Sequence, residues 1–136
     1  MSTTEMTSTG LHRVIDGTYA TIYEEVCTAL KAAGFEIVAE IDMAELLEKK
    51  SISYVRPFKT IFVFDSDLAH RVLTLAPAIN TLLPCQVTVL QTEDGQIEVK
   101  MTDPHIMWNT SASPYLAPIV EEFNKRLERA VDALKR

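Results

Sequence analysis

Two hydrophobic periods alternate along this chain, and their order limits the possible folds more than any other feature. Segments in which every second residue is apolar alternate with segments in which apolar residues recur every three or four positions. The first period is typical of strands with one buried face, and the second is typical of helices packed on a core. We therefore expect a sheet covered by amphipathic helices.

The expected elements are a strand, a helix, a strand, a short helix, a strand, a helix, a hairpin and a long helix. The strands are expected at 11–15, 35–41, 58–64, 85–91 and 96–102, and the last helix at 114–134. This order predicts an α+β fold in β-α-β-α-β-α-β-β-α order, with a long C-terminal helix. It also predicts a mixed sheet of about five strands, with helices mainly on one face.

Local signals indicate where the helices begin and end. Thr21 and Glu24 form a capping-box pattern at the start of the first helix, and Gly34 is suited to end it. Ser66 is expected to cap the third helix. The segment 58–64 ends in four consecutive apolar residues, which predicts a strand buried on both faces.

The length of 136 residues suits one domain with a single core. We expect this domain at 11–136, preceded by a disordered Ser/Thr-rich tail at 1–10. Helices on one side leave the other face of the sheet uncovered. Dimerisation through that face, or through the long C-terminal helix, would cover it, so we expect a homodimer.

Charge and hydropathy exclude several classes of partner. The net charge is −6, whereas nucleic-acid binding needs clustered Lys and Arg, so no nucleic-acid partner is expected. The longest purely apolar run is four residues, which is too short to cross a membrane. The first residues lack the basic start and apolar core of a secretory signal. We therefore expect no membrane partner and a cytoplasmic location.

Three basic residues form a candidate anion site. His70 and Arg71 are adjacent on the predicted third helix and could bind a carboxylate or phosphate. Arg56 could join them if the loop before the third strand folds over. The alternative is that the pair forms a solvated face or salt bridges with Asp65 or Asp67.

The two cysteines lead to different expectations. Cys85 opens a predicted strand after Pro84 and could be a nucleophile or redox switch if a nearby basic side chain lowered its pKa. It is thus a candidate for both catalysis and ligand binding. The alternative is a packed apolar residue, because free cysteine is often buried. Cys27 lies on the apolar stripe of the first helix and is expected to pack.

Met101, His105 and Met107 form the pattern M-x3-H-x-M, whose thioether and imidazole groups suit copper(I) or haem iron. Met101 also has a core position on its strand, so a packing role stays open. The sequence contains no Cys-x-x-Cys-His, glycine-rich phosphate loop, His-Glu-x-x-His or Gly-x-Ser-x-Gly. It therefore identifies no cofactor and no recognisable catalytic mechanism.

Short motifs between residues 23 and 103 follow one another in a characteristic order. They are Gly34-Phe35, Glu40-Ile41-Asp42, Arg56-Pro57-Phe58-Lys59, Ala69-His70-Arg71, Pro77, Leu82-Leu83-Pro84-Cys85 and Asp103-Pro104. In these motifs the chain resembles the domain of unknown function 302 family of small bacterial and archaeal proteins. The resemblance implies an α+β fold, a homodimer and no assigned reaction. Relatives often carry a cysteine-containing turn ending in Asn-Pro, which this chain lacks at 62–67.

The sequence favours a small homodimeric binding domain for an anionic or redox-active small molecule. Arg56, His70, Arg71 and Cys85 are expected around the pocket. One alternative is a thiol-dependent enzyme or redox protein that works through Cys85. Another is a pure protein-interaction module, in which the uncovered sheet face and the long helix serve assembly alone.

Overall fold

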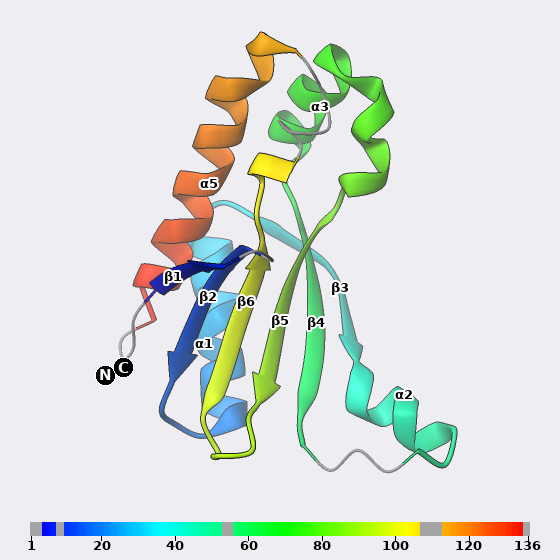
Figure 1. Cartoon of the computed structure of the whole chain (residues 1–136), viewed down its shortest axis with the longest axis vertical. Helices are drawn as coiled ribbons and strands as arrows, with labels where there is room; N and C mark the ends of the chain where they lie inside the picture. Colours follow the sequence, from blue (N-terminus) through cyan, green and yellow to red (C-terminus); the bar gives the residue numbers. More distant parts are fainter. Residues whose placement is uncertain (1–3, 8–9, 53–55, 107–112, 135–136) are drawn as a thin grey trace.

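The computed structural model describes residues 4–7, 10–52, 56–106 and 113–134. Their strands form a single sheet in the order β1-β2-β6-β5-β4-β3 (Figure 1). The strands are β1 (Thr4–Thr7), β2 (Gly10–Ile15), β3 (Glu36–Asp42), β4 (Phe58–Phe64), β5 (Cys85–Gln91) and β6 (Ile97–Thr102).

The helices follow the predicted order. They are α1 (Tyr19–Ala32), α2 (Met43–Lys49), α3 (Ser66–Leu75) and α5 (Ala117–Asp132), with the 3-10 helices η1 (Pro77–Leu82) and η2 (Pro114–Leu116). The α+β class, the element order and the long C-terminal helix are thus confirmed. None of the helices in the described ranges is long and apolar enough to span a membrane.

The sheet differs from the prediction in direction and in size. Every pairing between described strands is antiparallel, so the expected mixed sheet is wrong. A period of two shows which residues share a face, but it carries no information about the direction of the neighbouring strand. The sheet also has a sixth strand, because Thr4–Thr7 pair with β2 instead of belonging to a disordered tail.

The core lies between one face of the sheet and the helices α1 and α5. Ile61 and Val63 of β4 point into it, and the apolar stripe of α5 packs there as predicted. The largest side chains that are almost fully buried are Ile15, Ile22, Leu30, Ile61, Leu68, Ile79, Ile97, Met101, Leu116, Leu127 and Leu134. This packing holds α1 against the sheet.

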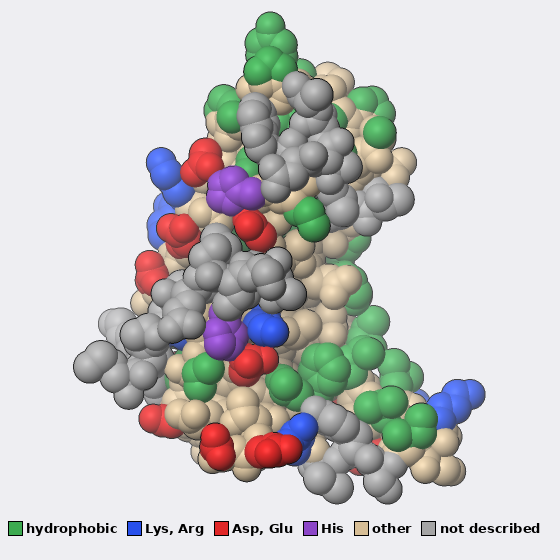
Figure 2. Space-filling model, in the orientation of Figure 1, with side chains coloured by type: hydrophobic (Ala, Val, Ile, Leu, Met, Phe, Trp, Pro, Cys, Tyr) green, Lys and Arg blue, Asp and Glu red, His purple; other side chains and the backbone are tan. Residues whose placement is uncertain are grey.

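The opposite face of the sheet faces the viewer in Figures 1 and 2, with α1 behind it. Phe58, Phe62 and Phe64 of β4 alternate onto this face and are only half-buried. The expectation that β4 is buried on both faces is therefore wrong. In Figure 2 hydrophobic side chains gather over the β4–β3 side of this face and charged side chains over the β2–β6 side.

The ends of α1 show which local signals decided the helix. It begins at Tyr19, with the Ile22 amide bonded to the Thr18 carbonyl at 3.0 Å, so Thr21 lies inside the helix and caps nothing. Gly34 ends it as predicted, with a φ of +94°. Its amide donates to the Lys31 carbonyl at 3.0 Å, which belongs to a Schellman turn. This tight turn leads directly into β3.

Candidate functional site

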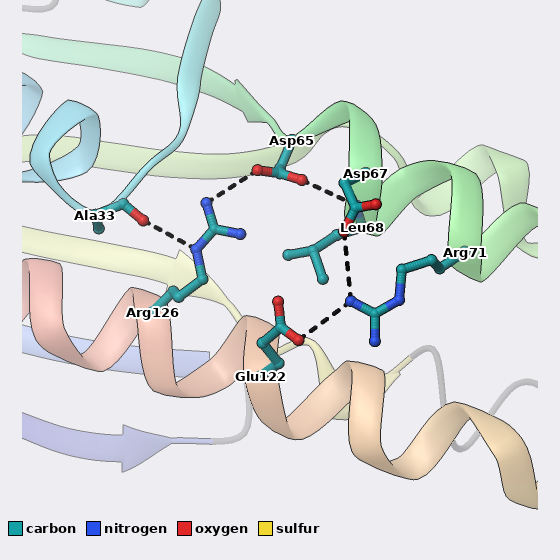
Figure 3. Close-up of polar contacts among 7 residues, drawn as sticks. All are labelled: Ala33, Asp65, Asp67, Leu68, Arg71, Glu122 and Arg126. Carbon is teal, nitrogen blue, oxygen red and sulfur yellow. Dashed lines mark hydrogen bonds and ion pairs between the residues drawn. The ribbon is translucent and has the colours of Figure 1, made fainter.

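The predicted basic pair on α3 does not form an open anion site. The Arg71 guanidinium donates to Glu122 of α5 at 3.1 Å and lies 3.5 Å from Asp67 (Figure 3). The hydrogen bond with Glu122, together with both carboxylate charges, raises the pKa of Arg71. His70 is exposed beside it. Arg71 therefore joins α3 to α5 with its charge already compensated.

Asp65 and Arg126 form a second link in the same region (Figure 3). Asp65, not Ser66, caps α3, because its Oδ1 accepts the Leu68 amide at 2.9 Å. Its Oδ2 accepts from the Arg126 guanidinium at 3.1 Å. Arg126 also donates to the Ala33 carbonyl at 2.9 Å. These contacts connect α5 with the ends of α1 and β4.

Arg56 lies at the other end of the sheet. It precedes β4, whereas α3 follows β4, and a strand of this length spans about 20 Å. Its guanidinium lies 3.3 Å from the carboxylate of Glu93. Arg56 therefore does not meet His70 and Arg71, and the expected pocket with all four residues around it is not formed.

Cys85 is packed in the core. It pairs with Val63 across β4 and β5 and is 2% exposed. Burial raises the pKa of its thiol to about 12, so the reactive thiolate is scarce at neutral pH. Its position corresponds to the packed alternative.

The two described residues of the M-x3-H-x-M pattern, Met101 and His105, have different surroundings. Met101 is buried in the core, and Met107 lies outside the described residues. The His105 ring places Nδ1 2.7 Å from Asp103 and Nε2 2.7 Å from Glu121. Within the described ranges, no group of three or more His, Cys, Asp or Glu side chains is arranged to hold a metal ion.

A solvent-open groove of about 910 Å³ lies between α1 and strands β3 and β4, and is here called the α1–β3–β4 groove. Its lining includes Tyr19, Tyr23, Cys27, Lys31, Glu40 and Lys59. The α1 residues recur every three or four positions, which places them on one face of the helix. The predicted residues Arg56, His70, Arg71 and Cys85 do not line this groove.

A β-bulge places Glu40 on a face of β3 that strict alternation does not predict. The register between β3 and β4 shifts between Ile37 and Ala39. Ile37 opposes Val63, but after the shift Glu40 opposes Ile61, so both face α1. Strict alternation had put Ala39 inward and Glu40 outward. One extra residue in the strand thus turns a carboxylate into the groove.

Tyr23 and Glu40 form the polar centre of the groove. The Tyr23 hydroxyl donates to Glu40 Oε1 at 2.5 Å. Burial, and then this hydrogen bond, raise the pKa of Tyr23, so its hydroxyl keeps the proton that it donates. The Tyr19 ring stacks beside that of Tyr23, with a centroid distance of 6.1 Å. The Tyr19 hydroxyl donates to the Val89 carbonyl at 2.7 Å, which holds it on the sheet.

Cys27 lies beside this centre, not in the core. It is half-buried, and its thiol lies 3.9 Å from Glu40 Oε1. The expectation that it packs on the apolar stripe is therefore met only in part. Burial, and then the charge of Glu40, raise the pKa of Cys27. The thiol is thus protonated at neutral pH and acts as a weak donor.

Lys59 and Lys31 supply the positive charge of the groove. The Lys59 ammonium lies over the Tyr23 ring, 4.5 Å from its centroid. Lys31 lies two helical turns after Tyr23, about 12 Å along α1. Neither lysine has a carboxylate within salt-bridge distance among the described residues.

Comparison with known proteins gives one family and one fold. The family model described as a domain of unknown function, DUF302, matches residues 12–134. Among solved structures, the chain is similar to the crystal structure of an uncharacterized conserved protein DUF302 from Bacillus stearothermophilus. The TM-score is 0.81 at 25% identity, covering 91% of this chain and 98% of that chain. A search of curated proteins gives no significant match.

Proposed function

Because this chain belongs to the family described as domain of unknown function DUF302, we propose a function from its own geometry: the domain binds a small anionic molecule in the α1–β3–β4 groove. The groove volume of about 910 Å³ lies at the upper end of the range of small-molecule pockets, about 300–1,000 Å³. The half-buried ring of Tyr19 offers aromatic surface for the uncharged part of such a ligand.

The observation that carries this proposal is which basic side chains already have a carboxylate partner and which do not. Arg56 and Arg71, predicted from the sequence to bind an anion, lie against carboxylates. Lys59 is half-buried, lines the groove and has no carboxylate within salt-bridge distance in the described part of the chain. A partly desolvated ammonium gains most from an anion that reaches it.

The test uses 3-phenylpropionate and its uncharged amide, 3-phenylpropanamide, as matched probes. NMR chemical-shift titration measures binding with dissociation constants of about 1 mM and identifies the residues affected. We expect the anion to bind at the groove at least tenfold more tightly than the amide. Lys59→Gln should remove that difference, whereas Lys49→Gln on α2 should not. Equal binding of the two probes, or shifts outside the groove alone, would count against the proposal.

Thiol chemistry at Cys85 has less support as an alternative. Its side chain is 2% exposed, and burial raises its pKa to about 12. A redox-active ligand in the groove would meet Cys27, which is half-buried.

We also propose that the face of the sheet opposite α1, together with α2, forms a homodimer interface. None of the α2 side chains is buried, and Figure 1 shows this short helix standing off one end of the sheet. Leu46 of α2 is 47% exposed, and Val38 of β3 and Ile52, which follows α2, are about half exposed. A seven-residue helix is marginal in water without a packing partner. The half-buried phenylalanines of β4 extend this apolar surface across the sheet.

Sedimentation velocity tests the interface with two exposed leucines as a matched pair. Leu46→Asp should dissociate the dimer, because it places a charge in the proposed interface. Leu75→Asp changes the exposed leucine of α3, away from that surface, and should leave the dimer intact. A monomeric wild-type protein, or equal effects of both substitutions, would refute this interface.

A further inference from the structure

The charges that line the α1–β3–β4 groove cancel. Lys31 and Lys59 contribute two positive charges, and Glu24 and Glu40 contribute two negative charges. Lys59 suits an anionic group, but the lining as a whole is not positive. A balanced lining with separate positive and negative positions is instead complementary to a ligand that carries both charges.

Glu40 keeps acceptor capacity toward the groove. Its Oε1 receives the Tyr23 hydroxyl and the weak Cys27 thiol contact. An ionised carboxylate offers about four lone-pair sites, and Oε2 has no partner among the residues that the structure describes. A purely anionic ligand next to Lys59 would also approach this carboxylate and be repelled by it. A donor or cationic group on the ligand removes that conflict.

A single side chain contacts both charged groups. The Lys59 ammonium lies over the Tyr23 ring at 4.5 Å from its centroid, and Glu40 accepts from the hydroxyl of the same residue at 2.5 Å. Both charged groups thus lie at one tyrosine, without a salt bridge between them among the described residues. An α-amino carboxylate carries its two charged groups on one carbon, so it can form a charge-assisted hydrogen bond of about 2.8 Å to each.

We infer that the ligand of this groove is a zwitterion of the α-amino acid type, with its ammonium group against Glu40 and its carboxylate against Lys59. The inference rests on the proposed function, because it names the ligand class of the same groove. The half-buried ring of Tyr19 favours a planar side chain on that ligand.

Three probes with the same phenyl group separate the contributions of the ligand's ammonium and carboxylate groups to binding. L-phenylalanine carries both charges, 3-phenylpropionate lacks the ammonium group, and 2-phenylethylamine lacks the carboxylate. NMR titrations at one pH and one ionic strength give the three dissociation constants. We expect L-phenylalanine to bind at least tenfold more tightly than either analogue, with shifts centred on Tyr23 and Cys27.

Two variants test the assignment of each charge. Glu40→Gln retains a side-chain oxygen for the Tyr23 hydroxyl but removes the charge, and should make L-phenylalanine and 3-phenylpropionate bind equally. Lys59→Met should do the same for L-phenylalanine and 2-phenylethylamine. Lys49→Gln on α2 is the control. Glu40 is exposed and Lys59 half-buried, and the amide spectra of the variants show whether the fold is kept.

The outcomes distinguish this inference from the proposed function. If 3-phenylpropionate binds the wild-type groove as tightly as L-phenylalanine, the zwitterion is overturned and anion binding stands. If 2-phenylethylamine matches L-phenylalanine, the anion-binding function is overturned as well. Failure of all three probes to shift groove residues overturns both. The inference is supported if wild type binds L-phenylalanine most tightly. Its advantage over 3-phenylpropionate should then be lost only in Glu40→Gln, and its advantage over 2-phenylethylamine only in Lys59→Met.

Discussion

Arg126 is the side chain whose removal should most clearly weaken the assembly of helices on the sheet. Its guanidinium donates to Asp65 at 3.1 Å and to the Ala33 carbonyl at 2.9 Å (Figure 3). It also lies over the Phe35 ring, 4.5 Å from its centroid. The side chains of Arg126 and Asp65 are only 12% and 19% exposed. Arg126→Met keeps an unbranched apolar stem but removes the charge and all the donors.

The cost follows from the two hydrogen bonds that the substitution removes. A hydrogen bond between charged groups contributes about 1.5–3 kcal/mol, and the bond to the carbonyl contributes about 1 kcal/mol. Asp65 keeps its bond from the Leu68 amide, so its carboxylate is not left without a donor. We therefore expect Arg126→Met to lower the free energy of unfolding by about 3 kcal/mol. For a chain of 136 residues this corresponds to a fall in Tm of about 10 °C.

Urea unfolding followed by circular dichroism measures this change. Arg129→Met, on the exposed side of the same helix, is the control and should cost less than about 0.5 kcal/mol. A double-mutant cycle with Asp65→Asn, which can still cap α3, isolates the ion pair. A cost below about 1 kcal/mol for Arg126→Met, or a coupling energy near zero, would refute the reasoning.

The pH dependence of the same variant gives an independent check. Burial alone would raise the pKa of Asp65, but the Leu68 amide and the Arg126 guanidinium outweigh it and hold this pKa below its ordinary value. A lowered pKa in the folded state contributes stability above about pH 4, and this contribution is lost as the pH falls through the lowered pKa. The difference between wild type and Arg126→Met should therefore shrink in acid.

Three further predictions concern other parts of the molecule. Gly34→Ala should cost about 2 kcal/mol or more, because alanine is strained at a φ of +94° and its Cβ would lie 2.6 Å from Arg126 Nη2; urea unfolding should show a smaller cost in the Arg126→Met background. Hydrogen bonds to Glu121 and then Asp103 raise the pKa of His105, so its stabilising contribution is complete below about pH 6.5 and is lost as the pH rises through the raised pKa. Urea unfolding against pH should show this decline in wild type and not in His105→Gln, and identical profiles would contradict it. Iodoacetamide labelling of the native protein at pH 8, read by peptide mass spectrometry, should modify Cys27 well before Cys85, because only Cys27 reaches the groove; faster labelling of Cys85 would show that the core opens there.

Most of the fold could be predicted because its signals are local. The inward residues of β6, Ile97, Val99 and Met101, alternate strictly and are all buried. The end of α1 at Gly34 needed only a residue that tolerates a positive φ. The start of α1 was misplaced because Thr21 and Glu24 resemble a cap, whereas packing of the helix on the sheet extends it back to Tyr19.

The candidate site shows what local signals cannot determine. Arg71 was a reasonable anion-binding residue until α5 placed Glu122 beside it, 51 residues along the chain. Arg56 and His70 are 14 residues apart, but the length of β4 separates them. Glu40 reaches the groove only because β3 carries a bulge where it pairs with β4.

The sequence by itself determined the class of fold, the order of its elements and the residues able to fill a core, because hydrophobic period and turn chemistry act over a few residues. Only the tertiary structure decided which charges are compensated, which cysteine is accessible and which side chains share a groove. Those properties depend on the register of strands and the packing of helices, which bring together residues far apart in the chain. Lys59 and Glu40 both contact Tyr23 for that reason, and their spacing along the chain does not predict these contacts.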